Sequence, residues 1–332
     1  MSSVQQFAAP PDGPVPRVSV IIPSYMSAPF ISEALDSVFA QTFSDYEVIV
    51  VNDGSPDTPS LEAALVPYLA RIHYLTQMNK GPSAARNRGI LHARGEFVAF
   101  LDSDDLWFPD FLRAQVSFLE SHPQVDASLA DVLVFGETGE TPWRLLTKGC
   151  PNILAFSQML RRQGGQIPSA AAARRLRVIE VGMFDEGLRY AEDLEFFVRI
   201  CFPDRAVGYL GQMLVKRRQH PGSLTSDPRN RRWRIGETEA LRRLGEKLDL
   251  DESQRKVLDE EIAAAGAALA LDDAYQHIAA HEFARAVQCL RSANTHYRDL
   301  RLSVASFCLG AFPRLTGHLL NWRLNRRPAR EV

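Results

Sequence analysis

The sequence predicts an α/β fold: a mostly parallel β-sheet with helices on both faces, followed by a C-terminal α-helical extension. Two features predict it. Four β-branched apolar segments are each followed by a segment with apolar residues at helical spacing, and from about Asn230 the pattern is almost wholly helical. With 332 residues and a hydrophobic fraction of 45%, the chain is long and apolar enough to bury a large core.

The first predicted strand and helix lie in residues 17–41. RVSVIIPSY (17–25) is a β-branched run with a proline near its end, and PFISEALDSVFAQ (29–41) repeats its apolar residues at helical spacing. The same order recurs in EVIVVNDGS and PSLEAALVPYLA, in RIHYLTQ and PSAARNRGILHARG, and in EFVAFLDSDD and PDFLRAQVSFLESH. Consecutive parallel strands need a crossover, so four such units predict a parallel sheet with both faces covered.

The regular alternation stops after Ala127. A mixed segment containing GQIPSAAAARR (165–175) leads to a predicted strand, AVGYLGQMLVKRRQH (206–220), which would close the far side of a cleft. LDDAYQHIAAHEFARAVQCLRSANTHY (271–297) predicts two antiparallel amphipathic helices. We therefore expect a flexible tail in residues 1–16, an α/β domain in residues 17–228 and a helical region in residues 229–332.

The charge balance disfavours a nucleic-acid partner. The formal net charge is −2, and basic and acidic side chains are mixed along the chain, so no general basic surface is expected. A small or membrane-bound substrate fits this composition better.

Cysteine usage and hydropathy favour a cytoplasmic protein. The four cysteines are widely scattered and form no CxxC pair, which disfavours a zinc site and a disulfide framework: Cys150, Cys201, Cys289 and Cys308. Residues 1–16 lack a basic start followed by an apolar stretch, so they do not predict a secretory signal. The segment 302–320 is interrupted by Pro313, Arg314 and His318, which favours a packed helix pair over a membrane span.

Three carboxylates follow a buried apolar segment in FVAFLDSDDLWFPDF (97–111), namely Asp102, Asp104 and Asp105. Ligands of parallel α/β sheets bind at the carboxyl ends of the strands. A hard divalent cation shared with phosphate oxygens would relieve the repulsion between these carboxylates. The alternative is that one aspartate caps the helix that begins near Pro109 while the others face solvent.

Two other predicted strand ends are polar. VNDGS places Asp53 and Gly54 where a carboxylate can accept hydrogen bonds from a base or ribose and glycine permits a sharp turn. NKGPSAARNRG adds Lys80 and Arg86, whose guanidinium can bond to a base or to Asp53. Taken singly, the first is an ordinary turn and the second a solvated helix face.

In this order, on consecutive strand ends, these stretches resemble the nucleotide-diphospho-sugar transferases of glycosyltransferase family 2, which have the Rossmann-like GT-A fold. The resemblance rests on VSVIIPSY, VNDGS, NKGPSAARNRG, LDSDD, YAEDLEFFVRI and RRQHPGSLT, and covers about residues 17–226. It implies a nucleotide-sugar-binding set of Pro23, Tyr25, Asp53, Lys80, Arg86, Asp102, Asp104, Arg218 and His220.

The resemblance also implies individual roles. Tyr25 lies against the base, which Asp53 and Arg86 hold, and Asp102 lies near the ribose. The expected metal ligands are Asp104, Asp102 and His220, with Mn²⁺ or Mg²⁺ as the cofactor. The family often has Asn after the tyrosine, where this chain has Met26, and we interpret this as a local change in the pocket wall.

The segment YAEDLEFFVRI supplies the expected catalytic base. Glu192 and Asp193 precede an apolar helical stretch, where acidic residues often only complement the helix dipole. Inverting sugar transfer needs a base that takes the proton from the attacking hydroxyl. The resemblance assigns this role to Asp193, whereas Glu192 is expected to bind an acceptor hydroxyl or to act as a structural acid.

The basic segment KRRQHPGSLT (216–225) follows the predicted strand 206–220. Basic groups and hydroxyl donors there would stabilise the charge that develops on a departing nucleoside diphosphate. The resemblance assigns Arg218 and His220 to the diphosphate or its metal.

The implied function is metal-dependent, inverting transfer from a nucleoside-diphosphate sugar, with a UDP-sugar favoured, to a glycan or lipid-linked acceptor in bacterial surface glycan or polysaccharide synthesis. The rivals are a nucleotidyltransferase and a non-catalytic nucleotide-sugar-binding protein on the same fold. A dinucleotide oxidoreductase is disfavoured because PSYMSAPF contains no glycine, and GxxxxGK[ST] is absent from the chain.

The C-terminal tail has two possible interpretations. From Arg291 to Val332 there are eight arginines and two acids, together with Trp322 and several leucines. Such a tail can lie on an anionic cytoplasmic leaflet, which would make the protein peripheral at the inner face of the membrane. The alternative is a solvated, packed helical cap.

Overall fold

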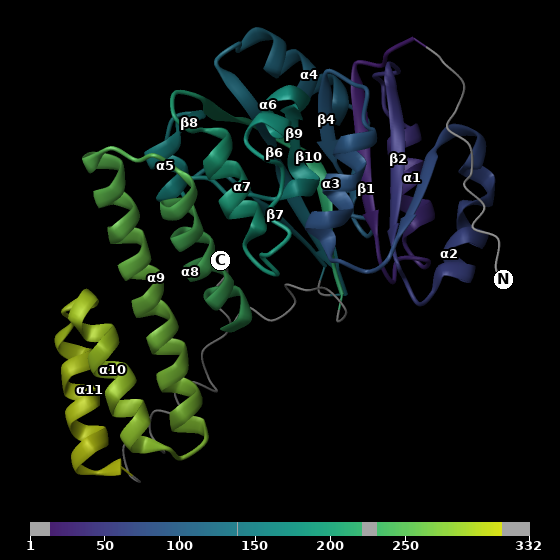
Figure 1. The fold of residues 1–332 in the computed structure, drawn as a ribbon. Coiled ribbons are helices and arrows are strands. Elements are labelled where there is room, and N and C mark those ends of the chain that lie inside the picture. Colours follow the sequence, from purple (N-terminus) through teal and green to yellow (C-terminus); the bar gives the residue numbers. More distant parts are fainter. Residues whose placement is uncertain (1–13, 138, 221–230, 314–332) are drawn as a thin grey trace. The chain divides into compact units, whose positions relative to one another are not determined.

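The computed structural model describes residues 14–137, 139–220 and 231–313. The chain divides into two compact units, residues 1–221 and 222–332. The first unit contains the sheet and the second is helical (Figure 1).

The first half of the sheet follows the predicted order. Its parallel strands lie side by side as β3-β2-β1-β4 and are β1 (Val18–Ser24), β2 (Tyr46–Asp53), β3 (His73–Gln77) and β4 (Phe97–Phe100). The intervening helices are α1 (Ile31–Phe39), α2 (Thr58–Leu65) with a 3₁₀ turn (Val66–Arg71), and α3 (Pro82–His92); α4 (Phe111–Ser121) follows β4 and β5. The four predicted strand–helix units are therefore confirmed.

Strand β1 lies at the centre of this half. All seven of its residues are buried, as expected when both faces of a parallel strand are covered. Ile21 pairs with Ile49 on β2 and with Phe100 on β4. A Cβ atom on Gly89 would lie 2.4 Å from the Ile21 side chain, so glycine is what lets α3 pack this closely against β1.

The second half of the sheet is mixed, which the sequence did not predict. Strand β9 (Ala171–Arg174) lies antiparallel between β4 and β6 (Val125–Gly136), and β6 runs parallel to β10 (Ala206–Gln219). Strand β10 confirms the predicted strand 206–220. The remaining elements of this unit are β5 (Leu106–Trp107), β7 (Gly139–Trp143), β8 (Ile153–Ala155), α5 (Phe156–Leu160), a 3₁₀ turn (Pro168–Ala170), α6 (Arg175–Glu180) and α7 (Glu192–Ile200).

The described part of the second unit consists of α8 (Arg231–Lys247), α9 (Glu252–Ala279), α10 (Phe283–Tyr297) and α11 (Leu300–Ala311). The two helices predicted within residues 271–297 are confirmed by the end of α9 and by α10. Their shared core contains Ala274, Ile278, Ala286, Leu290 and Leu309. Asp251 begins α9 with a capping box, because its carboxylate accepts the Gln254 N–H at 2.8 Å while the Gln254 side chain accepts the Asp251 N–H.

The sequence also led us to expect no disulfide framework and no membrane span. The four cysteines, all within the described ranges, form no disulfide. Among the helices of residues 14–137, 139–220 and 231–313, none combines the length and apolar character needed to cross a bilayer. The predicted tail in residues 1–16 lies largely outside the described residues, as do residues 314–332 of the basic C-terminal tail.

Candidate functional site

Asp53 organises the end of β2. Its carboxylate is buried and accepts the backbone N–H groups of Lys80, at 2.9 Å, and Gly81, at 2.8 Å. The side-chain amide of Gln77 donates to it at 2.8 Å. Asp53 therefore holds the loop between β3 and α3 in place, and the Lys80 side chain remains exposed.

Arg86 does not bond to Asp53, which corrects one of the two options that the sequence left open. Its guanidinium is buried and donates to Asp102 Oδ1 at 2.7 Å and to Glu192 Oε1 at 3.1 Å. It also lies over the ring of Phe184, 5.3 Å from the centroid. Two carboxylates satisfy a buried planar cation better than one, so Arg86 joins the end of β4 to the start of α7.

The loop after β4 brings its aspartates close together. The backbone N–H of Asp102 donates to Ser169 Oγ at 3.0 Å, and the N–H of Asp105 donates to the carbonyl of Asp102 at 3.0 Å. Asp105 is buried and accepts the backbone N–H of Arg218 at 2.9 Å. Burial, together with the negative charges of Asp104 and Asp102, raises the pKa of Asp105 to about 8.

Asp104 and His220 lie together, with Oδ2 and Nε2 3.1 Å apart. Their side chains are only partly exposed, at 29% and 25%. Burial and the charge of Asp102 raise the pKa of Asp104, while His220 opposes this shift. The structure thus brings together a carboxylate and an imidazole that are far apart in sequence.

Arg218 lies beside the same loop. Its Nε donates to the backbone carbonyl of Asp104 at 3.0 Å, and its Nη2 donates to Glu33 Oε2 at 2.9 Å. The guanidinium also lies near the rings of Phe30 and Phe135, 5.1 Å and 4.7 Å from their centroids. Glu33, on α1, is a contact that the sequence did not indicate.

Asp193 is the second residue of α7, which begins directly after Ala191, a residue with a left-handed φ of 58°. Its Oδ1 accepts the N–H of Leu194 at 2.8 Å. Burial and the charge of Glu192 raise the pKa of Asp193 to about 7, with Arg86 acting in the opposite direction. A carboxyl group with this pKa can gain and lose a proton near neutral pH.

The end of β1 and the turn after it contribute three positions. Pro23 is buried in the strand, whereas the Tyr25 side chain is 50% exposed and accessible to a ligand. Met26 has a φ of 55°, and its N–H donates to Ser55 Oγ at 2.7 Å. This bond ties the end of β1 to the turn after β2.

Ser169 is a contributor that sequence reasoning missed. It is fully buried; its hydroxyl accepts the N–H of Asp102, and its carbonyl accepts the Trp107 indole N–H at 2.7 Å. Ser169 and Asp102 are 67 positions apart. Nothing in GQIPSAAAARR marks this serine, because only the pairing of β9 with β4 brings it to Asp102.

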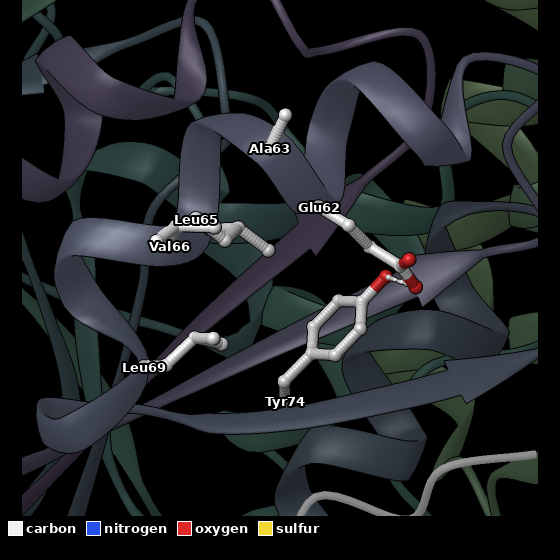
Figure 2. Close-up of a pocket in the computed structure, with 6 residues that line it drawn as sticks. All are labelled: Glu62, Ala63, Leu65, Val66, Leu69 and Tyr74. Atoms are coloured by element: carbon white, nitrogen blue, oxygen red, sulfur yellow. Dashed lines mark hydrogen bonds between the residues drawn. The ribbon is translucent and has the colours of Figure 1, made fainter.

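A separate hollow lies between α2, the following 3₁₀ turn and β3 (Figure 2). In it the Tyr74 hydroxyl faces Glu62 Oε1, at 3.3 Å. Its lining is Glu62, Ala63, Leu65, Val66, Leu69 and Tyr74. None of these belongs to the predicted site.

The matching family model and the similar curated proteins are all described as glycosyltransferases. The family described as Glycosyl transferase family 2 matches residues 19–181. An uncharacterized glycosyltransferase of Rickettsia typhi is 31% identical over 238 residues, which are 68% of this chain and 70% of that protein. An uncharacterized glycosyltransferase of Rickettsia conorii is 32% identical over 211 residues, but the chain covers 34% of its length, so it spans about a third of that relative.

Solved structures share the fold. S. aureus TarS 1–349 in complex with UDP-GlcNAc has a TM-score of 0.60 at 20% identity, covering 85% of this chain and 91% of that chain. The mannosyltransferase PcManGT from Pyrobaculum calidifontis, in complex with GDP-Man and Mn²⁺, has a TM-score of 0.58 at 19% identity, covering 92% and 87%.

Proposed function

Because the chain belongs to glycosyltransferase family 2 and has the GT-A fold of its structural neighbours, we propose that it is a metal-dependent, inverting glycosyltransferase. In this proposal it moves a sugar from a nucleoside-diphosphate sugar to a hydroxyl group of an acceptor.

The observation that carries the proposal is the bridge formed by Arg86. This buried cation binds Asp102 after β4 and Glu192 at the start of α7, so the metal-side carboxylates and the base-side helix belong to one ion-paired group. Asp104 and Asp193 are not bonded to Arg86 but lie close to its partners in the chain, Asp104 two residues after Asp102 and Asp193 directly after Glu192.

Asp193 is the proposed general base. It accepts the proton of the acceptor hydroxyl as that oxygen forms a bond to the anomeric carbon. The bond between the anomeric carbon and the diphosphate oxygen breaks at the same time, and the electron pair leaves with the nucleoside diphosphate. Attack from the side opposite the leaving group inverts the anomeric centre. Arg218 and His220 are assigned to the departing diphosphate.

The donor set fits a hard divalent cation that is shared with the substrate. Within the described ranges, no three His, Cys, Asp or Glu side chains form a metal-holding cluster. Mg²⁺-like cations are commonly held by one or two carboxylates plus substrate phosphates and water. Asp104, with Asp102 and His220 nearby, would supply the protein ligands. Such a cation, when bound, would neutralise charge on the diphosphate.

The remaining assignments extend the proposal. Neighbours bound to UDP-GlcNAc or GDP-Man support a nucleotide-sugar donor, and we favour a UDP-sugar. The proposed acceptor is a glycan or a lipid-linked glycan of a bacterial surface polysaccharide. The proposed location is the cytoplasm, with peripheral contact to the inner face of the membrane through the C-terminal tail.

A thermal-shift panel of UDP- and GDP-sugars, with and without Mn²⁺, tests donor binding. We expect stabilisation by one nucleotide class only when Mn²⁺ is present. Calorimetry on Asp104→Ala should then show loss of nucleotide binding, while Asp45→Ala, at an exposed aspartate, should bind as the unaltered protein does. Unchanged affinity in Asp104→Ala, or in excess chelator, would contradict the metal role.

Product analysis separates the proposal from its rivals. Release of nucleoside diphosphate from a nucleotide sugar supports sugar transfer. Release of pyrophosphate from a nucleoside triphosphate would instead identify a nucleotidyltransferase. Binding without turnover of any donor would identify a non-catalytic binding protein.

A further inference from the structure

Helix α11 has apolar residues on two opposite faces. One face packs into the core of the helical unit: Leu309 is fully buried there, and Leu302 and Ala305 lie against the same core. An amphipathic helix of a water-soluble unit needs only this one apolar stripe. The second face is therefore not explained by packing within the unit.

The second face is a stripe of exposed apolar side chains. Leu300 is 76% exposed, Val304 is 52% exposed and Phe307 is 70% exposed, and Ala311 continues the spacing. Positions i, i+4, i+7 and i+11 lie on one side of an α-helix, so the four form a continuous strip. Phe312, directly after the helix, is also 62% exposed. We call Leu300, Val304, Phe307 and Ala311 the outer stripe.

The start of the outer stripe is flanked by basic residues. Arg298 and Arg301 are exposed next to its first residue, and the only nearby acid in the sequence, Asp299, uses its carboxylate to cap the helix by accepting the Arg301 N–H at 2.7 Å. The sequence after residue 313, outside the described residues, is also basic and contains five arginines and one glutamate: Arg314, Arg323, Arg326, Arg327, Arg330 and Glu331. Apolar side chains flanked by cations match the interface of an anionic bilayer.

Charge argues against a second copy of the chain as the occupant. In a two-fold dimer formed by antiparallel outer stripes, the start of one stripe meets the end of the other, so Arg298 and Arg301 of one copy would lie against the apolar end of the partner's stripe. The outer stripe contains no acidic side chain, so these arginines would lose water without gaining a charged partner there. Phosphate headgroups, in contrast, would pair with each of these arginines.

We propose that the outer stripe of α11 lies in the interface of an anionic lipid bilayer, with Arg298 and Arg301 against the headgroups. A helix of 12 residues is about 18 Å long at 1.5 Å per residue, short of the roughly 30 Å of hydrocarbon, so α11 lies along the surface. The inference rests on the membrane location given under the proposed function and assigns that contact to α11, but it uses none of the site residues, so failure of vesicle binding leaves the proposed sugar transfer untouched.

Vesicle co-sedimentation of the full chain tests the proposal, with vesicles of phosphatidylcholine alone and with about 30% phosphatidylglycerol. The variant Val304→Ser with Phe307→Ser removes two apolar side chains from the outer stripe without changing charge. The matched control is Leu176→Ser with Ile179→Ser on α6, because Leu176 and Ile179 are also exposed, at 73% and 38%. We expect the unaltered chain and the control to bind the anionic vesicles alike, and the stripe variant to bind at least about tenfold more weakly.

Each other outcome overturns the proposal. If the stripe variant binds anionic vesicles as well as the unaltered chain does, or if the unaltered chain does not bind them, α11 does not contact the bilayer. A dimer that the stripe variant converts to a monomer in ultracentrifugation identifies a second copy as the occupant. A melting temperature lowered in the stripe variant but not in the control shows that the stripe packs against the chain itself.

Discussion

Asp193 links the proposed chemistry to the free energy of folding. Its pKa in the folded chain is raised to about 7, whereas an unfolded aspartate titrates near 3.8. Below both values the carboxyl is protonated in either state and contributes no pH dependence. Between them the unfolded state binds fewer protons than the folded state, so folding stability falls as the pH rises. Above about pH 7 the carboxyl is ionised in both states, so the loss of folding stability no longer changes with pH.

We therefore expect Asp193→Asn to be more stable than the unaltered chain at pH 8 and nearly equal to it at pH 4. Melting temperatures across this range, without nucleotide, measure the difference. Asp110→Asn is the control of opposite sign, because hydrogen bonds from Arg113 and Thr42 lower the pKa of Asp110. A stability difference for Asp193→Asn that does not change between pH 4 and pH 8 would show that Asp193 titrates normally.

The resemblance to family 2 implies Asn where this chain has Met26, and the backbone of Met26 gives a conformational reason. Its φ of 55° lies in the left-handed region, which Asn tolerates better than most residues. Met26→Asn should raise the free energy of unfolding by roughly 0.5–1 kcal/mol, measured by denaturant titration. Met78→Asn, at an exposed methionine without positive φ, should show no gain. Equal effects at both positions would rule out the conformational explanation.

At the scale of an element, the turn after β2 depends on Gly54. Its φ is +62°, and a Cβ atom there would lie 2.6 Å from the backbone nitrogen of Asn79. Gly54→Ala should therefore push the turn away from the loop between β3 and α3, which Asp53 holds.

The matched variant is Gly211→Ala, because Gly211 has nearly the same positive φ, +65°, but nothing lies within 4 Å of its added Cβ. Both variants carry the strain of a positive φ, on the order of 1 kcal/mol, and only Gly54→Ala adds the clash. We expect Gly54→Ala to lower the melting temperature clearly more than Gly211→Ala. A smaller or equal loss at Gly54 would mean that the two loops are not packed as described.

The elements differ in how well their sequences predict them. Strands β1 to β4 are β-branched or aromatic runs followed by helical patterns, so local sequence and tertiary structure agree. Strand β9, in contrast, is AAAR, and alanine favours helix in isolation. Pairing with β4 and β6 on either side imposes the extended conformation. Such long-range pairing is not visible in a local pattern.

The same distinction applies to the site at the scale of the whole molecule. The sequence placed Asp53 and the aspartates after β4 at one sheet edge because parallel strands end together. It did not predict which partner Arg86 takes, since Glu192 lies 106 positions away, nor the contact of Glu33 with Arg218 across 185 positions. The roles of these residues toward substrate remain predictions.

The central claim is that this chain transfers sugar with Asp193 as the base. The most direct measurement is the rate of nucleoside diphosphate release from the donor identified by the thermal-shift panel, in the presence of Mn²⁺ and acceptor. The unaltered chain should turn over with a rate that rises with pH up to about 7, where Asp193 loses its proton. Asp193→Asn should bind the donor with unchanged affinity and turn over roughly 10² times more slowly, or slower still. Turnover by Asp193→Asn within a few-fold of the unaltered chain, with the same pH profile, would contradict the account.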